Sequence, residues 1–321
     1  MDQTLTPTFL SLRELSDALE GRTFVATVGS FDGVHMGHRA VIKRTVSEAA
    51  EEGLASVVIT FDGHPSEVLR RSAPPLITGT TEKIRYLAPL GADAILLLPF
   101  TPELAALTMS DFIGQLREIG LRRMVLGYDS RFGSDTSGTP FDLFDKKMAS
   151  LGVPVERVAP VSPGGVEISS SHIRALLAGG RIPEAEALLG HPYSLCGYVA
   201  EGRQIGRQMG FPTANIVPEG AAPLIPRDAV LAAEVLLDGV TYPAMAYYGT
   251  APTISADDRD YRIEAFLLDF SGDLYGDRVE ISFLLYLRGD KRFDSLEELR
   301  AQLLQDERVT RDFFRRRGRS V

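Results

Sequence analysis

Between about residues 23 and 161, short apolar runs alternate with stretches of amphipathic helical periodicity. The runs are FVATVG, ASVVITF, DAILLLPF, RRMVLG and VPVERVAPV. Because most are apolar at consecutive positions, they are typical of strands that are covered on both faces. Strands that alternate with helices in this way predict a doubly wound α/β domain with a parallel sheet. Ligands of such sheets bind beyond the carboxyl ends of the strands, so the loops after the strands are the candidate sites.

The pattern changes after about Leu189, where extended segments broken by Gly, Pro and Asn replace the helical periodicity. The segments are GYVAEG, AVLAAEVLLDG, VTYPAMAYYG, RIEAFLLDF and VEISFLLYL. Repeated strands and turns of this length predict a small antiparallel β-barrel. A helix that ends in Gly followed by Pro places the change near Gly190 to Tyr193. We therefore expect two domains, residues 1–189 and residues 190–321.

A final helix is predicted to begin after Ser295, which has the residue type of an N-cap, and to end at about Phe314. Its periodicity predicts one apolar face, formed by Leu296, Leu299, Leu303 and Leu304. The arginine cluster from Arg315 to Arg319 is expected to be a solvated helix end rather than a surface for RNA or lipid.

Composition narrows the class of protein. The chain has 321 residues, of which 44% are hydrophobic, enough for about two domains with buried cores. Its net charge of −9 disfavours general binding to nucleic acid, which selects clustered Lys and Arg. The single cysteine, Cys196, cannot form an internal disulfide and is expected to be a buried small hydrophobe.

Targeting signals are not evident in the sequence. Residues 1–10 lack the basic and apolar regions of a signal peptide, and no apolar run approaches the ~18 residues of a membrane span. We expect a cytoplasmic protein that binds small molecules, with no membrane and no nucleic-acid partner. The oligomeric state is left open between a monomer and a weak homo-oligomer.

The first predicted strand runs into a loop that is rich in glycine and histidine. The loop reads GSFDGVHMGH, from Gly29 to His38, and a helix is expected to begin near Gly37. The free N–H groups and positive dipole end of that helix make the loop an anion site. His35 and His38 are three residues apart, so both imidazoles can donate to the same phosphates. The loop is interpreted as a triphosphate cradle, distinct from the GxxxxGK[ST] loop of P-loop NTPases.

Two alternatives to phosphate binding stay open for the histidine pair on these residues alone. The histidines are solvated helix caps, or they bind zinc together with Asp32. A second element favours phosphate, because SSSHIR, from Ser169 to Arg174, begins another predicted helix with hydroxyls and a basic residue. An arginine in the first turn opposes the helix dipole, and a bound anion would justify its position.

Four segments, in order along the chain, resemble one known family. GSFDGVHMGH is similar to the HxGH signature of nucleotidylyltransferases, and more closely to the GxFDGxHxGH form in the FMN adenylyltransferase module of bacterial bifunctional riboflavin kinase/FAD synthetases. Three further segments resemble the FDPHP, GxDFRFGxxxxG and SSTxIR elements of that module: FDGHP (Phe61 to Pro65), LGYDSRFGSDTSG (Leu126 to Gly138) and SSSHIR. Four ordered matches over about 150 residues are highly specific.

The resemblance implies a nucleotidylyltransferase fold of Rossmann-like type and adenylyl transfer. The phosphate of FMN would attack the α-phosphorus of ATP, and pyrophosphate would leave, with Mg²⁺ bridging phosphate oxygens. His35 and His38 would hold the reacting phosphates, and Ser170 and Arg174 the pyrophosphate end. The nucleotide and flavin pocket would be formed by the remaining matched residues, Gly29, Phe31, Asp32, Gly33, His64, Asp129, Arg131 and Ser171.

Three positions in this half depart from the family pattern. Ser130 stands where Phe is usual, and Thr136 stands where an arginine is common, so stacking on the flavin is expected to be altered. Gly63 stands where Pro is usual, which is expected to loosen that loop without removing a reactive group.

A second candidate site lies early in the C-terminal half. GRQIGRQMGFPTAN, from Gly202 to Asn215, joins a glycine-rich basic stretch to a proline and two short polar side chains. Glycine turns expose N–H groups to phosphate, and Thr213 and Asn215 offer oxygen ligands that suit Mg²⁺. An ordinary β-turn with polar tips is an equal alternative. Further on, Glu264 lies within an apolar strand, where it has either a functional reason or a salt bridge to an arginine.

These segments resemble the riboflavin kinase module of the same family. The module's GRxxGFPTANI, ExHxxDFxxDLYG and IRxExKFxSxxxLxxQIxxD read here GRQMGFPTANI, EAFLLDFSGDLYG and LRGDKRFDSLEELRAQLLQD. The resemblance implies that Glu264 is the general base on the ribityl 5′-hydroxyl and that Thr213 and Asn215 bind Mg²⁺ and ATP phosphates. It further implies that the substrates contact Gly206, Arg207, Phe211, Pro212 and Arg288.

Departures are denser in this half. Ala229 replaces a glycine of the family, and strain of ~1–2 kcal/mol is expected if the position needs a positive φ. Tyr247 and Tyr248 stand where smaller residues are usual, and Phe266 stands at the position of a histidine.

We therefore expect a bifunctional enzyme that uses ATP to convert riboflavin to FMN in its C-terminal domain and FMN to FAD in its N-terminal domain. One alternative keeps the adenylyltransferase and treats the second domain as a weakened kinase or a non-catalytic flavin-binding module. A flavin-sensing protein is disfavoured because His35, His38 and Arg174 are present. A nucleotidylyltransferase for a non-flavin substrate is disfavoured because the kinase-like half would supply the flavin. Direct transfer of FMN between sites, the flavin redox state and the preferred metal are left open.

Overall fold

The computed structural model describes residues 6–63, 74–165, 168–201, 210–250 and 261–319. Internal contacts divide the chain into two compact units, Met1–Ser170 and Ser171–Val321. The domain boundary expected from the sequence lies between residues 189 and 190. The residues between these two divisions form helices α8 (Ser170–Ala178) and α9 (Ile182–Leu189), and α9 packs on strands of the second unit.

A six-stranded sheet forms the centre of the N-terminal unit. In spatial order its strands are β1 (Thr8–Phe9), β4 (Ala94–Pro99), β3 (Ala55–Asp62), β2 (Phe24–Val28), β5 (Leu121–Gly127) and β6 (Val155–Val158). Every neighbouring pair is parallel. Strands β2 to β6 are the five predicted runs. Strand β1 was not predicted, because two residues are too short to show a pattern and only pairing with β4 identifies them.

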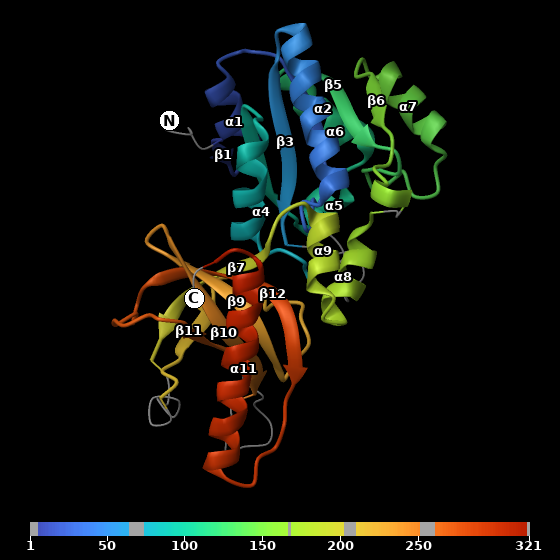
Figure 1. Cartoon of the computed structure of the whole chain (residues 1–321). Coiled ribbons are helices and arrows are strands. Elements are labelled where there is room, and N and C mark those ends of the chain that lie inside the picture. Colours follow the sequence, from blue (N-terminus) through green and yellow to red (C-terminus); the bar gives the residue numbers. More distant parts are fainter. Residues whose placement is uncertain (1–5, 64–73, 166–167, 202–209, 251–260, 320–321) are drawn as a thin grey trace. The chain divides into compact units, whose positions relative to one another are not determined.

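Helices connect the strands and cover both faces of this sheet (Figure 1). They are α1 (Leu12–Leu19), α2 (Met36–Glu52), α4 (Thr80–Leu87), α5 (Pro102–Ala106), α6 (Met109–Glu118) and α7 (Phe141–Ser150), with short 3₁₀ turns η1 (Ala88–Leu90) and η2 (Pro163–Gly165). Helix α2 contacts β2, β3 and β5 and therefore crosses the middle of one face.

Alternate strand residues pack into different cores, which explains why the runs are apolar at consecutive positions. In β3, Val57 and Ile59 join the core that includes residues of α1, α6 and α7, whereas Val58 joins a core with residues of α2 and α4. In β5, Met124 and Val125 divide between the two faces in the same way. The prediction of a doubly wound parallel sheet, covered on both faces, is confirmed.

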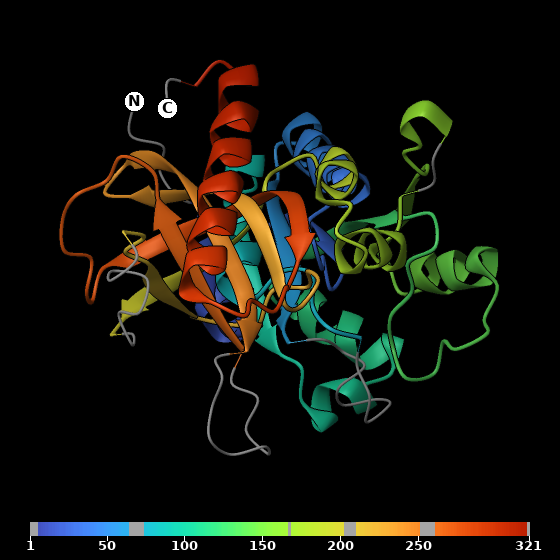
Figure 2. The same ribbon diagram turned by 60° about the horizontal axis from the view of Figure 1, so that its bottom comes forward.

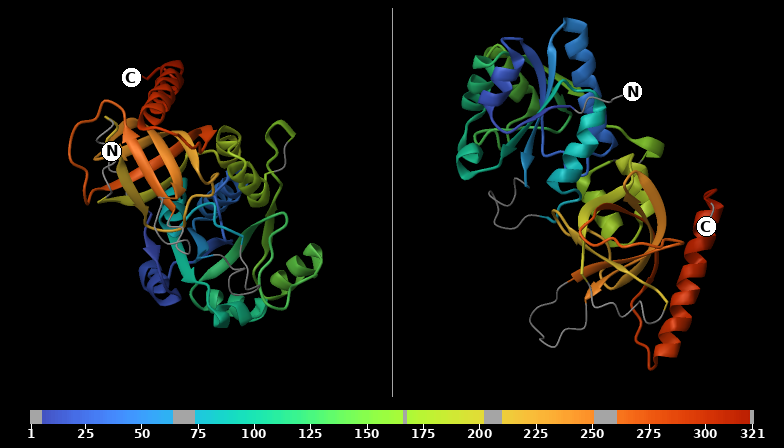
Figure 3. Two further views of the ribbon diagram at one scale, coloured as in Figure 1. Left: turned by 90° about the horizontal axis from the view of Figure 1, so that it is seen from below. Right: turned by 90° about the vertical axis from the view of Figure 1, so that its left-hand side faces the viewer.

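The C-terminal unit contains a closed antiparallel barrel (Figures 2 and 3). In order around the barrel the strands are β10 (Val240–Thr250), β11 (Tyr261–Leu267), β8 (Ala214–Pro218), β7 (Tyr193–Ala200), β12 (Arg278–Gly289) and β9 (Ala229–Leu237). The barrel closes because β9 pairs with β10 as well as with β12. The predicted barrel is confirmed. Strand β8 was not predicted. Its first two residues, Ala214 and Asn215, end the GRQIGRQMGFPTAN segment, for which phosphate and Mg²⁺ binding and an ordinary β-turn were equal alternatives.

Side chains of the barrel alternate between two faces. In β11, Ile263 and Ala265 are buried inside, whereas Glu264 and Phe266 are half-buried on the opposite face. The carboxylate of Glu264 therefore lies outside the barrel interior, although its neighbours in sequence are apolar. Cys196 of β7 is a buried free cysteine, as predicted.

Helix α11 (Leu296–Arg316) packs against β9 and β10 on the outside of the barrel (Figure 3). Ser295 is its N-cap and accepts a hydrogen bond from the N–H of Glu298, as predicted. The predicted apolar face is partly wrong, since Leu296 and Leu304 are 67% and 49% exposed. The buried positions are Asp306, Thr310 and Phe314. Asp306 can occupy a buried position because an arginine of the barrel neutralises it, and hydropathy alone does not show such a partner.

Candidate active sites

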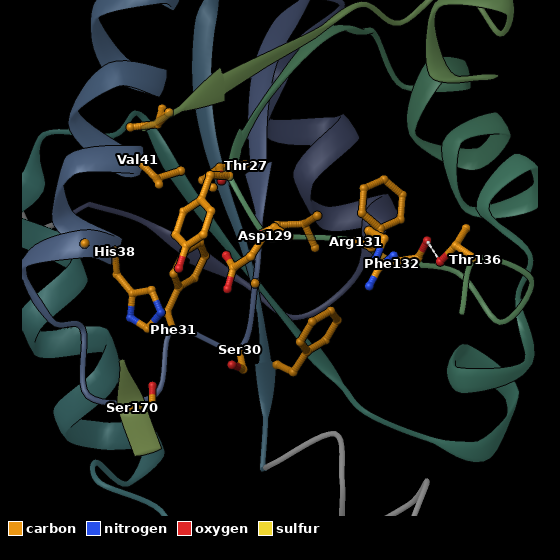
Figure 4. Close-up of a pocket in the computed structure, with 18 of the residues that line it drawn as sticks. Thr27, Ser30, Phe31, His38, Val41, Asp129, Arg131, Phe132, Thr136 and Ser170 are labelled. Atoms are coloured by element: carbon orange, nitrogen blue, oxygen red, sulfur yellow. Dashed lines mark hydrogen bonds between the residues drawn. The ribbon is translucent and has the colours of Figure 1, made fainter. Parts of the chain in front are cut away.

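A cavity of about 840 Å³ opens at the carboxyl ends of the parallel strands (Figure 4). It is lined by the ends of β2, β5 and β6, by the first turn of α2 and by the residues that lead into α8. This is the edge at which open α/β sheets bind ligands, and the volume suits a small molecule. The predicted site residues that line it are Gly29, Phe31, His35, His38, Asp129, Arg131 and Ser170.

The GSFDGVHMGH loop has a strained backbone. Phe31 and Val34 have φ angles of 46° and 39°, in the left-handed region that a β-branched residue such as Val34 rarely adopts. Burial holds both side chains in place. Gly33 N donates to Thr78 Oγ1 at 3.0 Å, which ties the turn to the chain before α4. A Cβ at Gly29 would lie 3.2 Å from the Phe31 ring, so a glycine there allows the ring to fold back.

His35 and His38 form a stacked pair at the beginning of α2. Their ring centroids are 3.5 Å apart, with an angle of 17° between the planes. His35 is the N-cap, and its Nδ1 accepts a hydrogen bond from His38 N at 3.3 Å. We infer that Nε2 carries the proton of the neutral His35 ring. His35 is therefore a helix cap, but it is buried, so the interpretation as a solvated cap is only partly correct. The same geometry brings both imidazoles to the cavity.

The surroundings of His38 favour its neutral form. Burial, the neighbouring His35 and the cation of Lys83 lower the pKa of His38 well below its ordinary value of 6.5. The Nδ1 atom of His38 is buried and has no hydrogen-bond partner among the residues that the structure describes. A neutral imidazole with an unused nitrogen, beside free helix N–H groups, is suited to hydrogen bonding with a phosphate.

Lys83 is a buried cation that sequence reasoning missed. Its side chain on α4 is almost fully buried, and Nζ donates to the carbonyl oxygen of Phe61 at 2.7 Å. Burial lowers the pKa of Lys83, and the carboxylates of Asp32 and Asp62 oppose that shift. Lysine is rarely buried, but a single lysine in an amphipathic helix carries no signal in the sequence. Only the approach of α4 to the end of β3 reveals it.

Asp32 is buried beneath the loop and serves the fold. Its Oδ1 accepts hydrogen bonds from Ile77 N at 2.9 Å and from Thr78 N at 3.2 Å. Gly33, also predicted at the site, is bound to the same segment. Within the described parts of the chain, no group of three His, Cys, Asp or Glu side chains is arranged to hold a metal. The zinc interpretation of the histidine pair therefore has no support there.

Asp129 and Arg131 lie on the loop that follows β5, and Figure 4 shows Arg131 across the cavity from His38. Arg131 donates to the carbonyl of Thr139, and its guanidinium lies 4.6 Å from the centroid of the Phe141 ring. Both contacts hold the guanidinium at the outer side of the cavity. Asp129 is exposed at its mouth.

Arg157 of β6 holds this loop in place and was not predicted. Its Nη1 donates to the carbonyls of Gly127 and Ser130 at 2.8 and 2.7 Å, and its Nη2 donates to Asp145 Oδ1 at 2.7 Å. The arginine thereby connects the loop after β5 to helix α7. Its sequence context, VERV, resembles that of any surface arginine, so no local signal distinguishes it.

The departures from the family pattern are accommodated locally. Ser130 closes a turn through its N–H, and Thr136 is buried, with its hydroxyl donating to two backbone carbonyls of the loop. Neither residue presents a ring or a charge to the cavity. Gly63 has a φ of 79°, which proline cannot adopt because its ring fixes φ near roughly −65°.

Ser170 joins the SSSHIR element to the first loop. It begins α8, and its hydroxyl donates to the carbonyl of Asp32 at 3.1 Å. Ser171 and Arg174 belong to the second unit, so their approach to the cavity stays a prediction. Arg174 is the fifth residue of α8, just past the first turn in which it was expected. His64 lies outside the described residues.

Asn215 of β8, Glu264 of the neighbouring β11 and Thr213, which directly precedes β8, come together. Asn215 and Glu264 are directly opposed in the strand register, so their side chains share one face. Thr213 Oγ1 donates to Glu264 Oε2 at 3.3 Å. Asn215 Oδ1 is buried and has no hydrogen-bond partner in the described chain. No ion pair between Glu264 and an arginine is found among the described residues, so the salt-bridge alternative is not supported there.

The other residues predicted for the second site have different surroundings. Phe211 is buried in an apolar cluster and packs edge-on against Phe266, with 5.1 Å between centroids. Pro212 is exposed. Arg288 forms a two-pronged ion pair with Asp306 of α11, with a shortest distance of 2.7 Å. Gly206 and Arg207 lie outside the described residues.

The barrel accommodates the residues that depart from the pattern of the riboflavin kinase module. The condition for strain at Ala229 is not met, because the positive φ of 56° falls on Asp228, a residue type that tolerates the left-handed region. Tyr248 is buried inside the barrel. Tyr247 lies on the opposite face, directly across from Glu264.

The fold and the two sites define a two-domain protein of the nucleotide-binding class, in which a doubly wound sheet precedes a small barrel. Residues 18–172 match the family described as FAD synthetase, and residues 189–314 match the family described as riboflavin kinase. Among the described residues, none of the helices is long and apolar enough to span a membrane.

Relatives match both units together. The bifunctional riboflavin kinase/FMN adenylyltransferase of Escherichia coli (strain K12) is 37% identical over 294 residues, covering 90% of this chain and 92% of that protein. The protein of the same name from Bacillus subtilis (strain 168) is 32% identical, with the same coverage. A crystal structure described as a macrolide-efflux protein from Streptococcus pneumoniae is 34% identical and has a TM-score of 0.80, covering 90% of this chain and 94% of that one. The chain belongs to the bifunctional riboflavin kinase/FMN adenylyltransferase family.

Proposed function

We propose that this chain is a transferase that phosphorylates riboflavin to FMN in its C-terminal unit and adenylylates FMN to FAD in its N-terminal unit. Each step uses one ATP, and the products besides the flavin are ADP and pyrophosphate, respectively. The observation that carries the proposal is the presence of both family matches in one chain, over residues 18–172 and 189–314. The product of one half is the substrate of the other, so a single chain can complete the route.

For adenylyl transfer, the cavity would hold the reacting phosphates against the first turn of α2. A phosphate oxygen of FMN attacks the α-phosphorus of ATP, the bond from that phosphorus to the bridging oxygen breaks, and pyrophosphate leaves. His35 and His38 would donate hydrogen bonds to the phosphates together with the helix N–H groups. Ser170 and Arg174 would hold the pyrophosphate end. No proton moves to or from a carbon atom in this step, and no covalent intermediate with the enzyme is needed.

For phosphorylation, Glu264 would accept the proton of the acceptor hydroxyl while the oxygen attacks the γ-phosphorus of ATP and ADP leaves. The hydroxyl of Thr213 donates to this carboxylate and fixes its orientation. The residues fit Mg²⁺, because a hydroxyl, an amide oxygen and a carboxylate form an all-oxygen donor set and the buried Asn215 Oδ1 has no other partner in the described chain. Thr213 and Asn215 would hold the ion, which would supply positive charge to neutralise the phosphates.

A weakened or non-catalytic second domain is the alternative. It is disfavoured because Thr213, Asn215 and Glu264 are all present and lie together. The cytoplasmic location, the lack of a nucleic-acid partner and the oligomeric state stay predictions from the sequence.

The proposal is tested by a chromatographic time course of the purified chain with riboflavin, ATP and Mg²⁺. We expect FMN to appear first and FAD second. Glu264→Ala should leave riboflavin unconverted but still turn supplied FMN into FAD, because loss of a general base lowers the rate by about 10²–10⁴. His38→Ala should stop at FMN, because loss of one charge-stabilising donor lowers the rate by about 10²–10³.

Two matched variants control for substitution itself. Glu297→Ala removes an exposed carboxylate of α11, and His191→Ala removes a histidine outside the cavity, so both should retain the two steps. If the wild-type chain converts FMN to FAD but leaves riboflavin untouched, the alternative with a non-catalytic second domain is correct.

A further inference from the structure

Tyr247 lies in the same row as the residues proposed for phosphorylation. Its Cα pairs with that of Glu264 on β11, and Glu264 pairs with Asn215 on β8. Directly opposed residues of an antiparallel sheet present their side chains on one face. The three side chains therefore form a row across three neighbouring strands, with Glu264 in the middle.

The ring of Tyr247 lies along its own strand, over Gly249. A Cβ at Gly249 would be 2.2 Å from Tyr247 Oη and 2.3 Å from Cζ. Gly249 does not have a positive φ, so this position depends on the missing side chain and not on the backbone freedom of glycine. The phenol therefore points toward the end of β10, at the rim of the barrel.

An apolar cluster adjoins this ring. Tyr247 and Phe266 pack against the buried side chains of Phe211, Val230 and Met245, on the face that α11 covers through Leu303. The rings of Tyr247 and Phe266 are only half-buried, so they leave apolar area next to the row of polar side chains. Such an arrangement suits a ligand with an aromatic body and a hydroxylated tail.

The hydroxyl of Tyr247 is surrounded by negative charge. Burial, followed by the carboxylates of Asp290, Asp228 and Glu264, raises the pKa of Tyr247 to about 12, and the cation of Arg288 opposes the shift. The phenol is protonated at neutral pH, as any tyrosine is, and the raised pKa keeps it a hydrogen-bond donor in alkaline solution as well. Tyr247 Oη has no hydrogen-bond partner within the described residues, so the donor is available to a ligand. The same carboxylates repel an anion, which favours a neutral acceptor group.

We propose that Tyr247 is a specificity-determining residue for the acceptor of the phosphorylation step, and that its hydroxyl donates a hydrogen bond to the polyhydroxyl chain of the acceptor beside Glu264. The inference rests on the proposed function of the C-terminal unit. The Tyr247 hydroxyl, together with the surrounding carboxylates, makes the site selective for a neutral, hydroxylated chain over a chain that already carries a phosphate.

The test is Tyr247→Phe in the full-length chain, which removes the donor and keeps the ring. We expect the KM for riboflavin to rise about two- to tenfold, the range of one neutral hydrogen bond, while kcat changes little. A flavin that carries a hydroxypentyl chain keeps the terminal hydroxyl and lacks the others. The wild-type chain should prefer riboflavin to this analogue, and Tyr247→Phe should lose that preference by the same factor.

Two further variants make the result decisive. Tyr198→Phe, on an exposed position of β7, should leave both KM values unchanged. Gly249→Ala should displace the Tyr247 ring and raise the KM for riboflavin although the hydroxyl is still present. Unchanged KM values in Tyr247→Phe, or an equal rise for both acceptors, would overturn the proposal.

Failure of the proposed function gives a different result. If the wild-type chain binds riboflavin but does not phosphorylate it, the kinase assignment fails. The role of Tyr247 is then still decided by comparing the Kd for riboflavin of the Tyr247→Phe variant with that of the wild type. If the wild-type chain neither binds nor phosphorylates riboflavin, both proposals are wrong.

Discussion

Burial shifts the pKa of individual residues at both sites in the direction that favours the neutral form. It lowers the pKa of His38 and raises the pKa of Tyr247, so the imidazole and the phenol are both neutral near pH 7. A neutral donor can bind a phosphate or a hydroxyl directly, whereas a charged side chain would first have to release the ion of opposite charge that is paired with it. The shift at His38 also makes the stability of the N-terminal unit depend on pH.

Stability of the N-terminal unit should fall as pH falls below about 6.5. In that range the histidine of the unfolded chain takes up a proton that the buried His38 does not, so acid favours unfolding, by at most about 1.4 kcal/mol per pH unit. His38→Gln should remove this contribution, so its free energy of unfolding should change less than that of wild type between pH 7.5 and 5.5.

Urea unfolding at several pH values, followed through the transition of the N-terminal unit, measures this difference. His191→Gln controls for the loss of an imidazole from the other unit. Parallel pH profiles for wild type and His38→Gln would show that His38 titrates in the folded chain as it does in the unfolded one.

At the scale of elements, helix α11 is attached to the barrel by charge as well as by apolar contact. Asp306 is nearly fully buried and is bound by Arg288 of β12 and by Gln302 Nε2 at 2.9 Å. The ion pair between Arg315 and Asp312, by contrast, joins two exposed residues of the helix itself. Desolvation makes the loss of a partner costly in the first pair and unimportant in the second.

Arg288→Met should therefore destabilise the C-terminal unit by about 2–4 kcal/mol, because it leaves a buried carboxylate without its cation. Arg315→Ala should cost only a few tenths, roughly the value of an exposed pair. Urea unfolding measures both. If Arg288 also contacts substrate, the KM for ATP or riboflavin should rise at a temperature where Arg288→Met is fully folded. An unchanged KM would assign Arg288 a structural role alone.

At the scale of the whole molecule, each unit has its own fully buried core. Ile59 lies in the core of the parallel sheet, and Ile281 is buried in the barrel, each without exposed area. Truncation of such a residue to alanine costs about 2–5 kcal/mol, through lost transfer free energy and the cavity that remains.

These cores allow the two activities to be lost separately. After heating at graded temperatures, Ile59→Ala should lose conversion of FMN to FAD at a lower temperature than wild type, so that FMN accumulates from riboflavin. Ile281→Ala should lose formation of FMN first and still convert supplied FMN. If either variant lost both activities in parallel, the expectation that the two units unfold independently would be wrong.

The elements and most candidate residues were predictable from the sequence because the signals are local. Runs such as ASVVITF are apolar on both faces of a strand, and the histidines of GSFDGVHMGH follow directly after such a run. Thr213 and Asn215 are two residues apart, so any extended segment places them on one face. Glu264 is recognisable as a carboxylate among apolar neighbours.

The sequence by itself thus determined the two folds, the order of the motifs and the residue types at each site, since these depend on neighbours along the chain. Tertiary structure alone decided the left-handed backbone at Val34, the burial of Lys83 and the face of α11 that packs on the barrel. It also decided that Tyr247 stands beside Glu264 and folds over Gly249. These features depend on strand register and on partners distant in sequence, and the pattern of a single segment carries no information about either.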